Sequence, residues 1–318
     1  MTPAQRWQRF VATASRPRGL RGLATFRVLS GIALLYQVLV NYAQRRVLWG
    51  PDGVLAFDDW RAGLHPLDLN LFALDGSILW FELAYHAVVV VTALWTVGVA
   101  PRVVTPMMWL VTWSLHGRNA FVLTGGNNLV QILLVYAMFA DLGGGKPASR
   151  PRWWTPYLGL LHNAAYLAIV LQVCLVYFSA GIWKVHGERW FFGTALYYAL
   201  RAPEFLLPGV SEPLYENATI VVLFSYATWI FQIAFPFAIG MRREVRVLTL
   251  AIALAFHVSI AVVMGLPVFG LLMIAADLAL LGDGDYAWLT ALWQRGRAAW
   301  QRRRAPSQGR GPIAAAPP

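Results

Sequence analysis

The stretch PYLGLLHNAAYLAIVLQVCLVYFSAGIW, residues 156–183, decides the fold class. It contains no Asp, Glu, Lys or Arg, and it is longer than the roughly 20 apolar residues with which a helix crosses a bilayer. The rest of the chain has the same character, because 58% of its 318 residues are hydrophobic and only 13% are charged. A soluble domain carries about 25% charged residues. The composition therefore predicts an all-α, polytopic integral membrane protein in a lipid bilayer.

Similar apolar runs predict a bundle of about eight transmembrane helices, of which the third and the eighth are short. The predicted spans cover residues 23–43, 78–98, 103–115, 127–142, 156–183, 218–239, 247–264 and 266–282. This pattern divides the chain into a basic N-terminal segment (1–22), a transmembrane domain (23–283) and a basic tail (284–318). The tail is expected to form an amphipathic helix on the membrane surface and to end in a disordered stretch.

The basic residues predict the orientation of these spans. Of the 26 Lys and Arg residues, 18 fall in the two terminal segments and in alternate connections, and seven fall on the other face. The positive-inside bias assigns the basic face to the cytoplasm, so both termini are predicted to be cytoplasmic and the functional face extracytoplasmic, in the cell (inner) membrane. Topology thus accounts for the net charge of +11, and no nucleic-acid partner is predicted.

Several enzyme classes find no support in the sequence. The GGGKP stretch at 143–147 has proline where a phosphate-binding loop needs a hydroxyl, and no zinc-protease or serine-hydrolase motif occurs. The single cysteine, Cys174, cannot form a disulfide or a cysteine-based metal site within one chain. No metal is predicted.

Lys184 is the residue that most strongly indicates chemistry. Only Lys146 and Lys184 among the 26 basic residues are lysines, and Lys184 lies on the predicted outer face, where positive charge is disfavoured. A desolvated lysine amine can lose its proton near neutral pH, whereas a guanidinium cannot. Its aromatic neighbours in the sequence are Phe178, Trp183, Trp190 and Phe191. The alternative is an interfacial lysine that marks the end of a helix.

Other polar residues are expected near the same outer face, and polar groups in or beside spans are costly enough to be functional candidates. Glu82 and His86 are four residues apart and therefore share one helix face. The remaining candidates are His116, Arg118 and Asn119 in the SLHGRN motif, His257 in the seventh span, and His186 and Trp190 beside Lys184. We expect a shared substrate site there, although each histidine could instead be a hydrogen-bonded packing residue.

A second group of polar residues is expected near the cytoplasmic edge. It consists of Arg27, Asp141, His162 and Asp277. Arg27 is predicted to form a structural ion pair with Asp141 or Asp277 that holds the bundle together. The alternative is that Arg27 extends to the membrane interface.

Five segments in order resemble the horizontally transferred transmembrane domain family, which includes the vitamin K-dependent gamma-carboxylase. They are FRVLSGIALLYQ (26–37), WGPDGVL (49–55), SLHGRNAFVLTGGNN (114–128), YFSAGIWKVHGERWFFGTALYYAL (177–200) and FHVSIAVVMGLPVF (256–269). Together they place the similarity over roughly residues 20–283.

This resemblance implies a catalytic site. Lys184 falls on the family lysine that deprotonates vitamin K hydroquinone, after which the quinol reacts with oxygen and the strong base formed removes a proton from a glutamate γ-carbon. His116 matches a functional histidine of the carboxylase. The implied cofactor is reduced menaquinone or vitamin K hydroquinone, the implied reaction is quinol oxidation or epoxidation with possible coupled carboxylation, and a peptide is a further possible substrate.

One departure from the family leaves the function open. The carboxylase has a large lumenal domain after its spans, where this chain has a short basic tail. Propeptide-directed carboxylation is therefore not expected. The alternative function is a non-catalytic membrane protein, either a transporter or a maturation or immunity factor for a secreted peptide.

The charge pattern makes a direct prediction about topology. In intact cells, Asp58→Cys and Glu212→Cys should react with a membrane-impermeant thiol reagent, because both positions lie in predicted outer connections. Ser307→Cys should not react, and Cys174 lies inside a predicted span, out of reach of the reagent. Labelling at position 307 in intact cells would reverse the proposed orientation.

Overall fold

The computed structural model describes residues 1–143 and 155–304, and no β-strand occurs in these two ranges. Lys146 of the predicted inner connection and residues 305–318 of the predicted tail lie outside the described residues. A long helix covers most of each of the eight predicted apolar runs. These helices are α2 (Leu20–Val40), α5 (Ile78–Val97), α6 (Pro101–Arg118), α7 (Gly125–Ala137), α8 (Thr155–Val185), α12 (Ala218–Ile239), α13 (Arg243–Val263) and α14 (Pro267–Ala279).

The other elements, of which α15 alone is long, fill the connections and the ends of the described chain. They are α1 (Pro3–Ala14), α3 (Arg45–Trp49), α4 (Phe57–Ala62), η1 (Leu71–Ala73), η2 (Ala120–Val122), α9 (Glu188–Phe191), α10 (Ala195–Arg201), α11 (Glu212–Tyr215) and α15 (Asp283–Arg304). The predicted basic tail therefore begins as a helix, α15.

Within residues 1–143 and 155–304, five helices are long and apolar enough to cross a membrane: α2, α5, α8, α12 and α13. A sixth span is obtained if α14 and α15 are counted together, but these two are bent by 101° at their junction. Helix α7 has 13 residues, which rise about 20 Å, less than the roughly 30 Å of a bilayer core. The protein is thus a multi-pass helical membrane bundle, and the count of eight spans stays a prediction.

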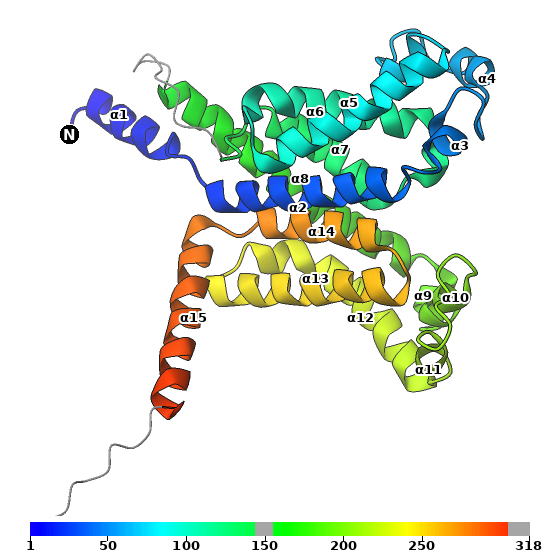
Figure 1. The fold of residues 1–318 in the computed structure, drawn as a ribbon. Helices are drawn as coiled ribbons and strands as arrows, with labels where there is room; N and C mark the ends of the chain where they lie inside the picture. Colours follow the sequence, from blue (N-terminus) through cyan, green and yellow to red (C-terminus); the bar gives the residue numbers. More distant parts are fainter. Residues whose placement is uncertain (144–154, 305–318) are drawn as a thin grey trace, which may run out of the picture.

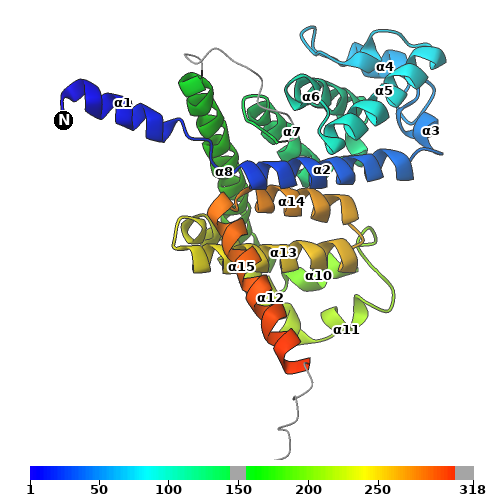
Figure 2. The same ribbon diagram turned by 60° about the vertical axis from the view of Figure 1, so that its left-hand side comes forward.

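The long helices are arranged in two groups that meet along α2 and α14. Helices α5, α6 and α7 lie beside α2 on one side, and α12 and α13 lie beside α14 on the other, while α8 passes along both groups (Figures 1 and 2). The connections that carry α3–α4 and α9–α11 lie at one end of the bundle (Figure 1). Helices α1 and α15 lie at the opposite end (Figure 1). Alternate connections therefore lie at opposite ends, as the charge pattern predicts.

Helices α2 and α14 are antiparallel and pack very closely (Figure 1). A Cβ on Gly22 would lie 2.7 Å from the carbonyl oxygens of both Ala279 and Leu281. Small residues permit this approach of two backbones inside a membrane bundle. At the same end, the Asp283 carboxylate accepts hydrogen bonds from the backbone N–H groups of Leu20 (3.3 Å) and Arg21 (2.9 Å). It thus supplies an acceptor and a negative charge at the start of α2.

A buried carboxylate fixes the sharp turn between α14 and α15. Asp285 is 1% exposed and accepts hydrogen bonds from Arg246 (2.7 and 2.9 Å), from Arg243 (3.3 Å) and from the backbone of Gly282 (2.9 Å). Helix α15 consequently leaves the bundle across the direction of α14 (Figure 1), with the Trp293 side chain exposed. This direction suits the predicted helix on a membrane surface.

The contact between α2 and α14 can be tested with one methyl group. Gly22→Ala is expected to lower the unfolding temperature of the purified protein, because the added Cβ forces the two backbones apart at a cost of about 1–3 kcal/mol. The matched control is Gly296→Ala in α15, where a Cβ would meet nothing within 4 Å. The control should melt at or slightly above the parent, since Ala favours a helix over Gly by about 1 kcal/mol. Equal unfolding temperatures for the two variants would contradict the close contact.

Candidate functional site

Lys184 lies in the last turn of α8, at the end of the bundle that carries α9–α11 (Figure 1). Its amine donates a long hydrogen bond of 3.4 Å to the carbonyl of Ala180 and lies 5.3 Å from the centre of the Trp190 ring. The turn at Gly187 starts α9 and brings Trp190 back over the lysine. No carboxylate of residues 1–143 or 155–304 lies within 4.0 Å of the amine. Lys184 is therefore a half-buried amine without an ion-pair partner in the described chain.

An apolar pocket with a volume of about 320 Å³ lies next to this lysine in the chain. Its lining residues come from the end of α8, from the α9 region and from α12: Val185, Phe191, Phe192, Tyr226 and Trp229. The Tyr226 hydroxyl donates a 2.7 Å hydrogen bond to the carbonyl of Phe191, which fixes one wall. The Trp229 indole N–H is buried and has no hydrogen-bond partner in the described chain. An amphipathic molecule with a hydrogen-bond acceptor would suit these walls.

Sequence reasoning missed Tyr226 and Trp229, because both lie in the apolar run of α12 and carry no charge. The recognisable signal is two amphipathic rings three residues apart, which places them on neighbouring positions of one helix face. Their partners in the α9 region belong to the WFFG stretch (190–193), which begins six residues after Lys184.

Glu82 and His86 form a separate group on α5. Glu82 accepts hydrogen bonds from Arg45 (2.9 and 3.1 Å) and from Arg46 (2.6 Å). His86 contacts the Glu82 backbone carbonyl at 2.7 Å and the Tyr42 hydroxyl at 2.9 Å. The two guanidinium groups thus neutralise the Glu82 carboxylate and connect the N-terminal part of α5 to α3. This geometry gives Glu82 a structural role, and its contact with a substrate stays a prediction.

Arg118 and Asn119 bind the backbone of the 44–77 connection. Both side chains are buried, and Arg118 donates two hydrogen bonds of 2.6 Å to the carbonyls of Gly50 and Leu55. Asn119 donates a 2.7 Å hydrogen bond to the carbonyl of Leu48. The SLHGRN motif therefore fixes the WGPDGVL segment, so two of the five resembling stretches are in direct contact. Contact of these two residues with a substrate stays a prediction.

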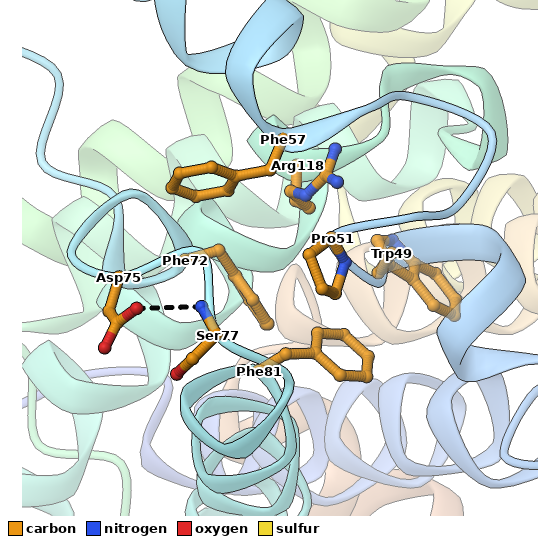
Figure 3. Close-up of a pocket in the computed structure, with 8 residues that line it drawn as sticks. All are labelled: Trp49, Pro51, Phe57, Phe72, Asp75, Ser77, Phe81 and Arg118. Atoms are coloured by element: carbon orange, nitrogen blue, oxygen red, sulfur yellow. Dashed lines mark hydrogen bonds between the residues drawn. The ribbon is translucent and has the colours of Figure 1, made fainter.

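A small cavity lies beside Arg118, inside the same connection (Figure 3). Its lining residues are Trp49, Pro51, Phe57, Phe72, Asp75, Ser77, Phe81 and Arg118. Figure 3 shows the rings of Phe57, Phe72 and Phe81 turned toward it, and the Asp75 carboxylate accepting a 2.8 Å hydrogen bond from the Ser77 backbone. The volume is about 10 Å³, which is at most the size needed for one water molecule. No organic substrate fits this cavity.

His116 is buried between α6, α7 and α2. Its Nε2 atom lies 3.2 Å from the Asn127 amide nitrogen, which also donates a 2.8 Å hydrogen bond to the Gln37 side chain. Its Nδ1 atom has no partner in the described chain. No hydrogen bond of the described residues joins this network to Lys184. The structure does not bring the two expected catalytic residues into contact, and the role of His116 stays a prediction.

His257 lies in a third group, with Tyr177 of α8 and Asp277 of α14. The Tyr177 hydroxyl oxygen is 2.8 Å from His257 Nε2 and 3.0 and 2.9 Å from the two Asp277 carboxylate oxygens. The Tyr177 ring stacks on Phe235 with ring centres 3.7 Å apart. All three polar side chains are buried. They therefore link three helices inside the bundle, away from both cavities described above.

Arg27 caps the end of α5 from inside the bundle. Its Nη1 atom donates to the carbonyls of Trp95 (2.7 Å) and Thr96 (2.6 Å), and its Nε atom donates to the carbonyl of Leu142 (3.3 Å). The last carbonyls of a helix have no partner in the helix itself, so a buried guanidinium satisfies them. Gly98 has a φ of +83°, and a Cβ there would lie 2.8 Å from the Arg27 guanidinium. The glycine is needed both for the turn and for this close approach.

The predicted ion pair of Arg27 with Asp141 or Asp277 is therefore wrong. Asp141 accepts a 3.1 Å hydrogen bond from the Gly143 backbone, and Asp277 contacts Tyr177. Arg27 also does not reach the interface, because it is only 6% exposed. The Arg27 guanidinium binds backbone carbonyls instead of the expected carboxylate. The pattern of residue types in the sequence does not indicate such partners.

The comparisons with known proteins bear on the second half of the chain most directly. A family model described as "HTTM domain" matches residues 150–282. Residues 150–282 of the chain are thus similar to the HTTM family. This match confirms the family resemblance, since HTTM is the vitamin K-dependent carboxylase-like transmembrane family. The matched part of the HTTM domain contains Lys184, Trp190, the residues of the 320 Å³ pocket, and the Tyr177 group.

Two curated relatives, both from Bacillus subtilis (strain 168), extend the similarity toward the N-terminus. "Sporulation-delaying protein SdpB" is 25% identical over 266 residues, which cover 80% of this chain and 78% of the relative. "Uncharacterized protein YitO" is 26% identical over 215 residues, which cover 65% of this chain and 69% of the relative. No solved structure gives a significant match.

The role of Arg118 in this protein can be tested by removing its guanidinium. Arg118→Ala leaves two buried carbonyls unpaired, and hydrogen bonds to a charged group contribute about 1.5–3 kcal/mol each. We expect an added protease to cut the 44–77 connection faster than in the parent. The control is Arg61→Ala in the same connection, where an exposed guanidinium contacts the Phe57 ring at 5.6 Å. Equal protection of this connection in both variants would show that Arg118 is not its anchor.

Proposed function

We propose that this protein is a membrane enzyme in which Lys184 acts as a general base on a lipid-soluble quinol. The observation that carries the proposal is the half-buried Lys184 amine, which has no carboxylate partner in the described chain. The next residue, Val185, lines the aromatic pocket. The family resemblance adds that the matching lysine of the carboxylase deprotonates vitamin K hydroquinone.

The surroundings of the amine favour a base over a permanent cation. A structural lysine is usually held by a carboxylate, and here the amine has one long hydrogen bond and one aromatic face. Both contacts are weak compared with an ion pair in an apolar environment. A lysine so placed can release its proton and accept another from a phenolic hydroxyl group.

The pocket suits the ring of such a substrate. Its volume of about 320 Å³ lies at the lower end of small-molecule sites, which leaves room for a two-ring quinol head while an isoprenoid tail extends into the lipid. Aromatic walls pack against a flat ring. Reduced menaquinone or vitamin K hydroquinone fits this description as the substrate of the reaction.

The proposed site faces the extracytoplasmic side of the cell membrane. Lys184 and the pocket lie at the end that carries the α9–α11 connection, opposite α1 and α15 (Figure 1). The N-terminal segment has five arginines and no acidic residue, which favours the cytoplasm for the α1 end. A lipid-soluble substrate would enter from the bilayer.

A second candidate function is a non-catalytic maturation or immunity factor for a secreted peptide. The observation that favours it is the similarity to "Sporulation-delaying protein SdpB", whose name refers to the delay of sporulation and not to a reaction on a quinol. In this case the pocket would bind an apolar side chain of a peptide, and Lys184 would only hold α9 against α8 through Trp190.

Substitution of the lysine separates these two functions. Purified protein is incubated with reduced menaquinone or vitamin K hydroquinone and oxygen, and the epoxide is measured. Lys184→Ala and Lys184→Arg should both lose activity by at least 100-fold, a typical contribution of general base catalysis. The control is Arg189→Ala, which removes an exposed guanidinium from the face of Tyr198 in the same region and should stay active. A small primary amine added to the buffer should restore part of the rate to the alanine variant.

The opposite outcome is equally clear. In that outcome the parent forms no epoxide. Mass spectrometry then compares the secreted peptides of cells with the parent gene and cells with the gene deleted. If cells with Lys184→Arg secrete the same peptides as cells with the parent gene, Lys184 is only an anchor. The quinol proposal then fails, and the role in handling a secreted peptide stands.

A further inference from the structure

The Tyr177, His257 and Asp277 side chains form a compact polar group inside an otherwise apolar part of the bundle. They come from α8, α13 and α14, and each is at most 2% exposed. The rings that surround them are Phe231, Phe235, Phe256 and Phe269. The proposed function does not use this group, and neither cavity described above is lined by it.

The number of protons available decides how these contacts are made. The Tyr177 hydroxyl has one proton but lies within 3.0 Å of acceptor atoms on both partners, namely His257 Nε2 and the Asp277 carboxylate. It can donate to only one of them, so the other contact is a hydrogen bond only if that partner donates to the hydroxyl oxygen. Either the carboxyl group is protonated and donates, or His257 carries a proton on Nε2.

The charge balance distinguishes these arrangements. With a neutral imidazole protonated on Nε2, the group has a net charge of −1, stabilised only by the tyrosine hydroxyl. With an imidazolium, two opposite charges are buried and their nearest atoms are 3.6 Å apart. His257 Nδ1 has no partner in the described chain, and it carries a proton both in the imidazolium and in a neutral imidazole that accepts from Tyr177, so Nδ1 does not distinguish these two arrangements. A protonated carboxyl group leaves no charge buried. Burying charge inside a membrane bundle is costly unless the charges are closely paired.

No other charged group in the described chain offsets a negative charge at this place. Helix α14 has only Asp277, and α7 and α12 have no charged residue. The charged residues of the packed helices are engaged elsewhere or exposed: Arg27 on the α5 carbonyls, Arg243 and Arg246 on Asp285, the exposed Arg21 and Glu244 in the first turns of α2 and α13, and Lys184 two turns beyond Tyr177. Cys174 lies three residues before Tyr177 on α8, and a thiol has no positive charge that could offset a carboxylate.

We propose that Tyr177, His257 and Asp277 form a binding site for one proton, which rests on the Asp277 carboxyl group. The carboxyl group donates to the tyrosine hydroxyl, and the hydroxyl donates to His257 Nε2. The proton can move along this chain without leaving the protein. The Asp277 O–H bond breaks as its proton binds the tyrosine oxygen, and the hydroxyl proton passes to Nε2, which yields a carboxylate and an imidazolium with the phenol unchanged.

Infrared spectroscopy tests the resting position of the proton independently of any enzymatic product. The difference spectrum between the parent and Asp277→Asn at neutral pH should contain the C=O band of a protonated carboxylic acid. Asp285, the other deeply buried carboxyl group of the described chain, contacts two arginines and is common to both samples. Absence of the band would overturn the proposal.

Two further variants keep the test decisive. Asp277→Asn should melt like the parent, because its amide donates to Tyr177 as the carboxyl group does, whereas Asp277→Leu should melt lower. If asparagine destabilises as strongly as leucine, the site needs a carboxylate and the proposal is wrong. Tyr177→Phe removes the acceptor of the carboxyl proton and should shift the band to the higher frequency of a weakly hydrogen-bonded acid. An unchanged band position in a folded Tyr177→Phe protein would also contradict the proton chain.

Discussion

Helices α2 and α14 approach so closely at Gly22 that two backbone carbonyls of the α14 end occupy the space next to its Cα. The two groups of helices meet along this contact, and the Asp283 carboxylate joins the turn after α14 to the first residues of α2. The remaining long helices are placed by it, since α5 packs on α2, α13 packs on α14, and α8 contacts both α12 and α14. These helix contacts also fix the positions of the connections that carry α3–α4 and α9–α11, at the end of the bundle where Lys184 lies.

The preference of the chain for arginine has a structural reason. Arg27 and Arg118 each bind two or three backbone carbonyls from segments far away in the sequence, which a planar group with several donors does well. Lys184 does nothing of this kind, because it meets one carbonyl at 3.4 Å and one aromatic face. Lys184 thus differs from Arg27 and Arg118 in its contacts as well as in its residue type. This difference supports a role for Lys184 other than that of a structural cation.

The sequence predicts the helices well and their side-chain partners poorly. Apolar runs placed all eight long helices within a few residues, because the length of an apolar run depends only on local composition. Whether α6 and α7 cross the membrane does not follow from the same runs, since one is more polar and the other is short. The true partners of Arg27 were missed because they are backbone carbonyls, which every residue possesses. Tyr177 was missed because a lone tyrosine in an apolar helix has no periodic signal, although its partners His257 and Asp277 were both recognised as polar residues in spans.

The order of the helices along the chain has a consequence for biosynthesis. Helix α2 is the first apolar helix to leave the ribosome, and α14 is the last of the eight long helices. Throughout synthesis, the face of α2 that contains Gly22 therefore has no permanent neighbour, and the bundle closes only when almost the whole chain has been inserted. A ribosome that stalls before α14 would release a fragment with the other seven long helices. This fragment would lack α14, the helix that completes the bundle. Such a fragment would expose the α2 face to the lipid and to the proteases that survey the membrane.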